Sequence, residues 1–285
     1  MPEPQVLMTG IAFGESPRWH DDRLWFADWG ARELIAVDLE GKSDVMLQLG
    51  FPSFQAICFD WLPDGRQLIV SSREGLVLRR EPDGSLVTHA DLTRLSDPSW
   101  NEIVVDGRGN AYLNSIGFDL GSGAEAAPGI LALVTPDGSA RQVADGIAFG
   151  NGMAVTPDNS TLIVAESYAN RLTAFDIAAD GSLSNRRVWA DLGSGVPDGI
   201  CVDAEGAVWY ADVPNKHCVR VREGGEMLQK VDLDRGCFAC MLGGPDRRTL
   251  FLIAREWRGM AGTADEARTG QVLTVDAPAP GIGWP

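Results

Sequence analysis

The sequence predicts an all-β protein, namely a six-bladed β-propeller with four-stranded blades around a central channel. Six segments follow one plan, in which a polar residue precedes a short apolar strand, an Asp-, Gly- or Pro-rich turn and a second apolar strand. Strand-like stretches follow each hairpin, so each repeat of about 46 residues holds about four strands. No long amphipathic helical pattern interrupts them. A β-sandwich is the alternative, but it would not explain the register that the repeats share.

The six hairpins can be followed along the chain by their turn residues. They read GESPRWHDDRLWFAD from Gly14, FQAICFDWLPDGRQLIVSS from Phe54, SWNEIVVDGRGNAYLNS from Ser99, FGNGMAVTPDNSTLIVAES from Phe149, VPDGICVDAEGAVWYAD from Val196 and CFACMLGGPDRRTLFLIA from Cys237. Turns such as Asp64-Gly65 and Pro157-Asp158 supply the geometry that joins two antiparallel strands. Further strands are expected at Leu34–Leu39, Leu76–Arg80, Ile130–Val134, Leu172–Phe175 and Val219–Arg222.

No linker divides the chain, and we therefore expect a single domain over residues 1–285. The segment Trp257–Gly270 is predicted to be a long loop, and the chain after Asp276 is expected to be irregular. A strand near Gln5–Leu7 is expected to pair into the last blade and close the ring.

The charge of the chain excludes several classes of partner. Lys and Arg number 24 and Asp and Glu number 40, which gives a formal net charge of −16. Nucleic acids and anionic membranes both attract clustered basic residues, so neither is an expected partner. No apolar run reaches the roughly 18 residues of a membrane-spanning helix, and the N-terminus lacks the basic and apolar regions of a secretory signal.

The five cysteines indicate a reducing compartment. Cys58, Cys201, Cys218, Cys237 and Cys240 are odd in number and irregularly spaced, which does not fit a disulfide framework. The C-x-x-C pair at Cys237 and Cys240 has no further ligands at zinc-site spacing and no βαβ context for a redox motif. We therefore interpret all five as ordinary thiols and expect a cytoplasmic protein.

One polar position recurs in the repeats. Counting back five residues from the end of the first strand of each hairpin gives Glu15, Gln55, Asn101, Asn151 and Asp198. The sixth repeat has an uncertain register and offers Cys237, Phe238 or Ala239. Equivalent positions in successive blades lie on a ring around the central channel, so these side chains are expected to converge at one mouth.

Such a convergence favours a bound cation. Glu15 and Asp198 would repel each other unless a positive charge lay between them. Carboxylate and amide oxygens, without His or thiolate ligands, suit a hard divalent ion such as calcium, magnesium or manganese. The alternative is that each residue only satisfies backbone groups at a strand start, which explains single Asn or Asp residues better than a whole column. Gln55 is the weakest member and is assigned only to the surroundings of the site.

Four motifs carry a resemblance to a known family. GESPRW from Gly14, FGNGMAVTPD from Phe149, PDGICVDAEG from Pro197 and GGPDRRTLFL from Gly243 resemble the SMP-30/gluconolactonase/luciferin-regenerating-enzyme family of six-bladed propellers, over most of the chain. The resemblance implies that Glu15, Asn151 and Asp198 bind one divalent metal ion, with calcium as the first candidate and Mg²⁺, Mn²⁺, Zn²⁺ or Fe²⁺ as the others. It also implies that Asn101, in WNEIVVDGRGN, contacts substrate or water.

The chain departs from the family pattern beside Asn101. Family members that act on sugar lactones typically carry an Arg two residues before this Asn, and here the position is Ser99. Glu102 stands where the family has Asp. A sugar-acid lactone is therefore a doubtful substrate. Ser99, Trp100 and Tyr168 are expected to give either a more apolar pocket or ordinary packing.

The resemblance implies a metal-dependent carboxylic-ester hydrolase, first of all a gluconolactonase-like lactonase, acting on a small lactone or ester. In this interpretation the metal polarises the lactone carbonyl, Asp198 is the general base, Glu15 and Asn151 hold the ion, and Asn101 orients water or substrate. Two alternatives stay open, namely phosphotriester or aryl-ester hydrolysis on the same metal site and a non-enzymatic ligand-binding propeller with a structural metal. A Ser-His-Asp esterase is disfavoured because the chain lacks a G-x-S-x-G motif. The sequence leaves the oligomeric state open.

Overall fold

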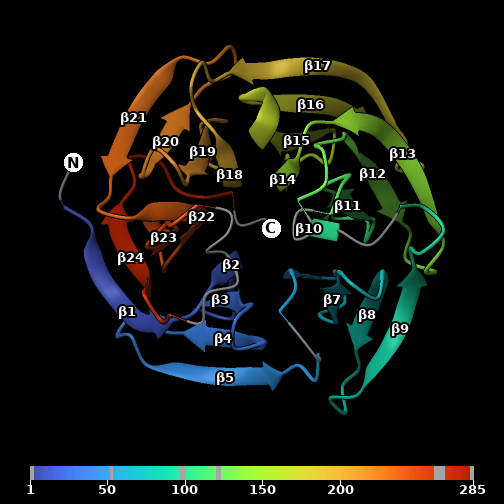
Figure 1. Cartoon of the computed structure of the whole chain (residues 1–285), viewed down its shortest axis with the longest axis horizontal. Helices are drawn as coiled ribbons and strands as arrows, with labels where there is room; N and C mark the ends of the chain where they lie inside the picture. The colour runs from blue at the N-terminus through green and yellow to red at the C-terminus, as the bar shows by residue number, and fades with distance from the viewer. Residues whose placement is uncertain (1–2, 52–53, 97–99, 120–122, 260–266, 283–285) are drawn as a thin grey trace.

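The computed structural model describes residues 3–51, 54–96, 100–119, 123–259 and 267–282, and the structural statements below refer to these residues. They form six four-stranded antiparallel sheets arranged as blades around one axis (Figure 1). The prediction of an all-β, six-bladed propeller with four-stranded blades is confirmed. No helix in the described ranges has the length and apolar character needed to cross a membrane.

The strands of each blade follow one another from the channel outward. Blade 1 holds β2 (Gly14–His20), β3 (Arg23–Asp28), β4 (Glu33–Val37) and β5 (Ser43–Gln48). Blade 2 holds β6 (Ile57–Trp61), β7 (Gln67–Ser71), β8 (Leu76–Arg80) and β9 (Leu86–Asp91). Blade 3 holds β10 (Trp100–Val105), β11 (Ala111–Ser115), β12 (Gly129–Val134) and β13 (Ala140–Ile147).

The second half of the chain repeats the arrangement. Blade 4 holds β14 (Gly150–Val155), β15 (Thr161–Glu166), β16 (Arg171–Ile177) and β17 (Leu183–Asp191), with the short 3₁₀ helix η2 (Ser167–Ala169) after β15. Blade 5 holds β18 (Pro197–Val202), β19 (Val208–Asp212), β20 (His217–Val221) and β21 (Met227–Asp232). Blade 6 holds β22 (Gly236–Gly243), β23 (Thr249–Arg255), β24 (Gly270–Asp276) and, at its outer edge, β1 (Gln5–Ile11).

The first strand of the chain closes the ring. Strand β1 pairs antiparallel with β24, which confirms the expected closure of the last blade by the N-terminal strand. The strand near the start of the sequence thereby becomes the outer strand of a sheet whose other three strands come from the end of the chain. Part of the predicted loop at residues 257–270 lies outside the described residues, and the described parts of it, 257–259 and 267–269, contain no strand. The tail after Asp276 is irregular, as expected, except for one bridge from Gly281 to Asp203 of blade 5.

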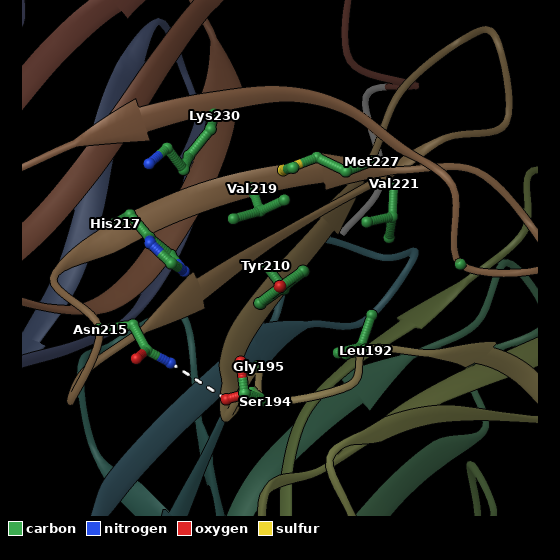
Figure 2. Close-up of a pocket in the computed structure, with 11 residues that line it drawn as sticks. Leu192, Ser194, Gly195, Tyr210, Asn215, His217, Val219, Val221, Met227 and Lys230 are labelled. Atoms are coloured by element: carbon green, nitrogen blue, oxygen red, sulfur yellow. Dashed lines mark hydrogen bonds between the residues drawn. The ribbon is translucent and has the colours of Figure 1, made fainter.

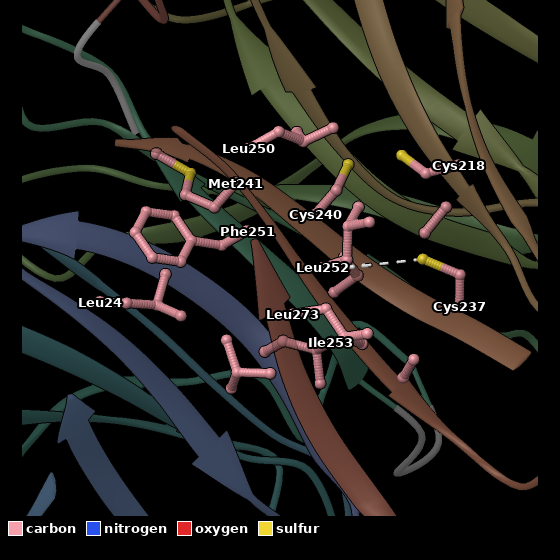
Figure 3. Close-up of a cluster of buried hydrophobic side chains, with 14 of the residues drawn as sticks. Leu24, Cys218, Cys237, Cys240, Met241, Leu250, Phe251, Leu252, Ile253 and Leu273 are labelled. Atoms are coloured by element: carbon pink, nitrogen blue, oxygen red, sulfur yellow. Dashed lines mark hydrogen bonds between the residues drawn. The ribbon is translucent and has the colours of Figure 1, made fainter. Parts of the chain in front are cut away.

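Apolar side chains fill the spaces between the blades. The largest cluster joins blades 5, 6 and 1, and Figure 3 shows Cys218, Cys237 and Cys240 within it beside Phe251 and Leu252. All five cysteines of the chain are buried free thiols. Small buried thiols of this kind pack like apolar side chains, which agrees with their interpretation as ordinary thiols.

Candidate metal centre

The predicted polar column occupies one structural position at the channel. Glu15, Asn101, Asn151 and Asp198 are each the second residue of the innermost strand of their blade. In blade 6 the second residue of β22 is Cys237, which settles the register that the sequence left open. Gln55 lies two residues before β6 and is therefore outside this set of strand positions.

A β-bulge lies at or directly after the column position in each of these strands. The pairing register shifts between Glu15 and Arg18 in blade 1 and between Gly150 and Met153 in blade 4, and the innermost strands of blades 3, 5 and 6 shift at the corresponding place. Bulges re-aim side chains and are common beside functional sites. Blade 2 has no such shift in its innermost pair, which explains why Gln55 falls out of line.

The two column carboxylates lie close enough to perturb each other. Burial raises the pKa of Glu15 well above its usual value, and the charges of Asp198 and Glu102 raise it further. The pKa of Asp198 is also raised well above its usual value, first by burial and then by Glu102, against a hydrogen bond from the Asn151 side chain. Burial raises the pKa of the Cys237 thiol as well, so this sixth member of the ring adds no charge at neutral pH.

These side chains fit a divalent cation. Glu15 accepts the backbone N–H of Ser16 and Asp198 accepts the Asn151 amide, but in the described part of the chain no Lys, Arg or His forms an ion pair with either carboxylate. Two buried carboxylates without a basic partner, together with the amide oxygen of Asn151, supply the oxygen ligands that a hard ion requires. No group of three or more His, Cys, Asp and Glu side chains with a metal-binding arrangement occurs among the described residues. The predicted ligand set has only two such side chains and an amide, so it stays a prediction.

The neighbouring blade fixes the backbone that carries Asn151. Asn101 Nδ2 donates to the Gly150 carbonyl over 3.0 Å, and Asn114 Nδ2 donates to the Asn151 carbonyl over 2.6 Å. The Asn151 amide in turn lies 3.4 Å from the hydroxyl of Ser167 in η2. Because the Asn101 N–H faces a carbonyl, its oxygen is the atom left to orient water or substrate.

A set of buried carboxylates that the sequence reasoning missed anchors the start of these innermost strands. Asp28 accepts the backbone N–H groups of Ala12 and Phe13 at 3.0 and 2.9 Å. Glu166 accepts the N–H of Ala148 at 2.8 Å, and Asp212 accepts that of Val196 at 2.9 Å. Each acid ends the second strand of its hairpin, as the sequences WFAD, IVAE and WYAD show, so the repeat alignment contained the signal for them.

The predicted surroundings of the site fall into different environments. Trp100 has no exposed surface and packs in the blade-2 and blade-3 core, so ordinary packing is the alternative that the structure supports. Tyr168 is 51% exposed and its ring lies 4.7 Å from that of Phe149, two residues before Asn151. Gln55 is buried, with its Oε1 accepting the N–H of Arg73 over 2.8 Å. Ser99 lies outside the described residues.

One surface pocket lies away from this centre. It has a volume of about 330 Å³ and lies on the outer strands of blade 5, where Figure 2 shows Tyr210, His217 and Lys230 around it. Its basic groups already have acidic neighbours, since Lys230 Nζ lies 2.7 Å from Asp232 and His217 Nε2 lies 3.4 Å from Asp212. None of the column residues lines it.

Substitution of Gly152 by Ala tests how tightly the ligand-bearing strands must approach. A Cβ at this position would lie 2.5 Å from the Ile200 nitrogen and 2.6 Å from the Asp198 carbonyl oxygen, so β14 and β18 would have to separate. We expect a loss of about 2 kcal/mol of unfolding free energy and weaker metal binding, measured by urea denaturation and Mn²⁺ titration. Gly50→Ala is the matched control, because a Cβ there meets nothing within 4 Å. A Gly152 variant with wild-type stability and metal binding would show that β14 and β18 need not approach so closely.

Comparison with known proteins identifies the family. The family model described as SMP-30/gluconolactonase/LRE-like region matches residues 13–255. The pentonolactonase XacC of Haloferax volcanii is 27% identical over 97% of this chain and 95% of its own length. The 6-deoxy-6-sulfogluconolactonase of Pseudomonas putida is 28% identical over 98% and 96%. The crystal structure of a calcium-binding protein, regucalcin, from Agrobacterium tumefaciens superposes with a TM-score of 0.80 at 23% identity, covering 99% of this chain and 96% of that one. The family match spans most of the chain, and this protein belongs to the SMP-30/gluconolactonase/LRE-like family.

Proposed function

We propose that this protein is a divalent-metal-dependent lactonase whose ion is held by Glu15, Asn151 and Asp198. The observation that carries the proposal is the pair of buried carboxylates, which occupy equivalent positions in β2 and β18 and have no basic partner in the described ranges. Two of the relatives described above are named as lactonases, and a third is a calcium-binding protein, so we propose calcium as the first candidate ion.

The chemistry divides between the ion and the protein. A bound divalent ion at such a site acts as a Lewis acid on a carbonyl oxygen and stabilises the negative charge that develops there. The carboxylate of Asp198 acts as general base and takes a proton from the attacking water. The free oxygen of Asn101 orients the water or a polar group of the substrate. Asn114 keeps Asn151 in place through the backbone.

Aromatic rings beside the site support a substrate with an apolar part. Phe149 leads into the strand that carries Asn151, and the rings of Phe118 and Tyr168 lie 5.9 and 4.7 Å from it. The half-exposed face of Tyr168 offers apolar surface within one residue of Ser167, which contacts Asn151. An alkyl- or aryl-substituted lactone suits this surface better than a polyol does. We also propose a cytoplasmic location, in keeping with the buried free thiols.

A substrate panel tests the proposal. We expect calcium- or manganese-loaded protein to open dihydrocoumarin and alkyl γ-lactones with a kcat/KM at least about tenfold above that for a pentono- or gluconolactone. Tyr168→Ala is expected to reduce the values for the apolar lactones and to leave those for the sugar lactones unchanged. An aryl ester and a phosphotriester belong in the same panel. A preference for either of these would favour the second hydrolase activity, and no turnover of any compound would favour a binding protein with a structural metal.

A further inference from the structure

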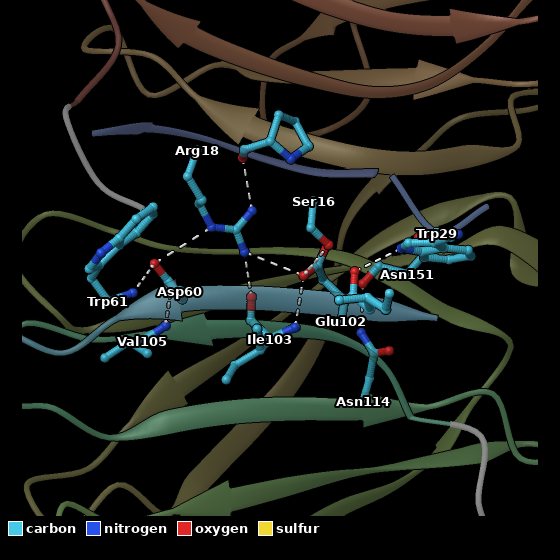
Figure 4. Close-up of polar contacts among 12 residues, drawn as sticks. Ser16, Arg18, Trp29, Asp60, Trp61, Glu102, Ile103, Val105, Asn114 and Asn151 are labelled. Carbon is cyan, nitrogen blue, oxygen red and sulfur yellow. Dashed lines mark hydrogen bonds and ion pairs between the residues drawn. The ribbon is translucent and has the colours of Figure 1, made fainter. Parts of the chain in front are cut away.

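A buried arginine lies between the innermost strands of blades 1, 2 and 3, close in sequence to a predicted ligand. Arg18 lies on β2, three residues after Glu15, and only 6% of its side chain is exposed. Its Nη2 donates to the Ile103 carbonyl of β10 over 2.6 Å and lies 3.3 Å from Glu102 Oε1. Its Nε lies 3.6 Å from Asp60 Oδ1 of β6, as Figure 4 shows. One guanidinium therefore joins the innermost strands of blades 1, 2 and 3.

The carboxylate that Arg18 holds is the third acid of the centre. Glu102 follows Asn101 on β10, is buried, and raises the pKa of both Glu15 and Asp198 through its charge. Unlike those two carboxylates, Glu102 has several hydrogen-bond donors and a basic partner. The Ser16 hydroxyl lies 3.1 Å from both of its oxygens, and the backbone N–H of Ile103 donates to it over 2.9 Å. Arg18 forms an ion pair with it.

The backbone of Ser16, whose hydroxyl contacts Glu102, has a strained conformation. Ser16 has a φ of +50°, in the left-handed region that residues other than glycine rarely adopt. Strain of this kind persists where the surrounding structure imposes it, and it is concentrated at functional sites. Here it accompanies the bulge of β2 and the contact between the Ser16 hydroxyl and a carboxylate on blade 3.

We propose that Arg18 is a positioning residue which, together with Ser16, keeps Glu102 out of the coordination sphere of the ion. The inference rests on the proposed metal site. Glu15 and Asp198 together neutralise a divalent ion, whereas a third carboxylate would leave the complex negative and occupy a position that water or substrate needs. A neutral complex polarises a carbonyl oxygen more strongly than an anionic one. The contacts of Glu102 with Arg18 and Ser16 thus hold this buried acid in a position where it is unavailable as a ligand.

The test measures Mn²⁺ binding and the water bound to it in the Arg18→Met variant. Without the guanidinium, Glu102 is free to enter the coordination sphere, so we expect Mn²⁺ to bind at least tenfold more tightly. The water-proton relaxation enhancement per bound Mn²⁺ is expected to fall as the carboxylate replaces a water. Arg18→Lys keeps the charge and is expected to remain near wild type in both measurements.

The double variant Arg18→Met/Glu102→Gln separates ligation from a change of charge alone. If Glu102 becomes a ligand, the second substitution restores both the wild-type affinity and the relaxation enhancement. Tighter binding that persists in the double variant, or an Arg18→Met protein with unchanged affinity and relaxation, would overturn the inference.

A single substitution keeps the inference testable if the Arg18→Met protein fails to fold. Glu102→Gln alone is expected to change the dissociation constant for Mn²⁺ by less than threefold, because Glu102 is not a ligand in the native protein. A loss of Mn²⁺ affinity of more than thirtyfold, with fewer waters displaced from the ion, would overturn the inference. These binding measurements need no turnover, so a protein that binds Mn²⁺ as expected but opens no lactone would refute the proposed function and leave this inference standing.

Discussion

Replacement of Asp198 by Asn is expected to reduce lactone turnover by roughly 10³-fold while the propeller remains folded. An amide of the same shape preserves the space in the channel but cannot accept a proton from water. The variant also removes one of the two charges that bind the ion, so the dissociation constant for the metal is expected to rise. Activity is measured at saturating metal, and folding is checked by circular dichroism and thermal denaturation.

The same substitution has the opposite effect on the stability of the metal-free protein. Burial and the charge of Glu102 raise the pKa of Asp198 well above its usual value, so its ionised form destabilises the fold at neutral pH. Metal-free Asp198→Asn protein is therefore expected to melt at or above the wild-type temperature. Asp145→Asn, an exposed change on β13, serves as the control that should alter neither activity nor melting.

Two results would revise the role of Asp198. Full turnover in the Asn variant would remove it from the mechanism. Recovery of turnover at high metal concentration would make it a ligand and leave the general base to another group.

The fold was predictable because its information is local and repeated. Hairpins joined by Asp-, Gly- or Pro-rich turns recur at one offset, and the column counted from them falls on the second residue of β2, β10, β14 and β18. The count failed where no polar residue marks the position. Cys237 sits in an apolar stretch, and only the pairing of Gly236 with Arg255 shows that it belongs to the ring. In blade 2 the count gives Gln55, which lies outside β6, because the innermost pair of strands in this blade has no bulge.

The surroundings of the column were harder to predict because they depend on contacts between blades. Nothing local to Arg18 or Glu102 indicates that their side chains meet, 84 residues apart in sequence. The partner of this buried charge is set by the order of the blades around the ring, in which β6 contacts both β2 and β10. Trp100 shows that adjacent residues can have different environments. Asn101 belongs to the polar column, whereas the ring of Trp100 packs between blades 2 and 3.

Removal of the metal is expected to abolish turnover and to lower the melting temperature. An ion present at about 100 times its dissociation constant stabilises the folded state by about 2.7 kcal/mol, which corresponds to roughly 5–10 °C for a chain of this size. Dialysis against a chelator followed by addition of calcium or manganese is expected to reverse both effects. A Glu15→Gln/Asp198→Asn double variant provides the control, since its melting temperature should no longer respond to metal.

The dependence on pH follows from the sign of the two pKa shifts. The pKa values of Glu15 and Asp198 are raised in the fold by burial and by neighbouring carboxylates, so their contribution to stability is present below their unfolded values of about 4 and is lost as the pH rises. The metal-free protein is therefore expected to lose stability as the pH rises above about 4, whereas bound metal compensates the same charges. The difference in melting temperature between the two forms should widen as the pH rises. A difference that stays constant over this range would show that the ion does not bind between these two carboxylates. Loss of stability on chelation, in a protein that turns over no lactone, ester or phosphotriester, would identify the metal as structural.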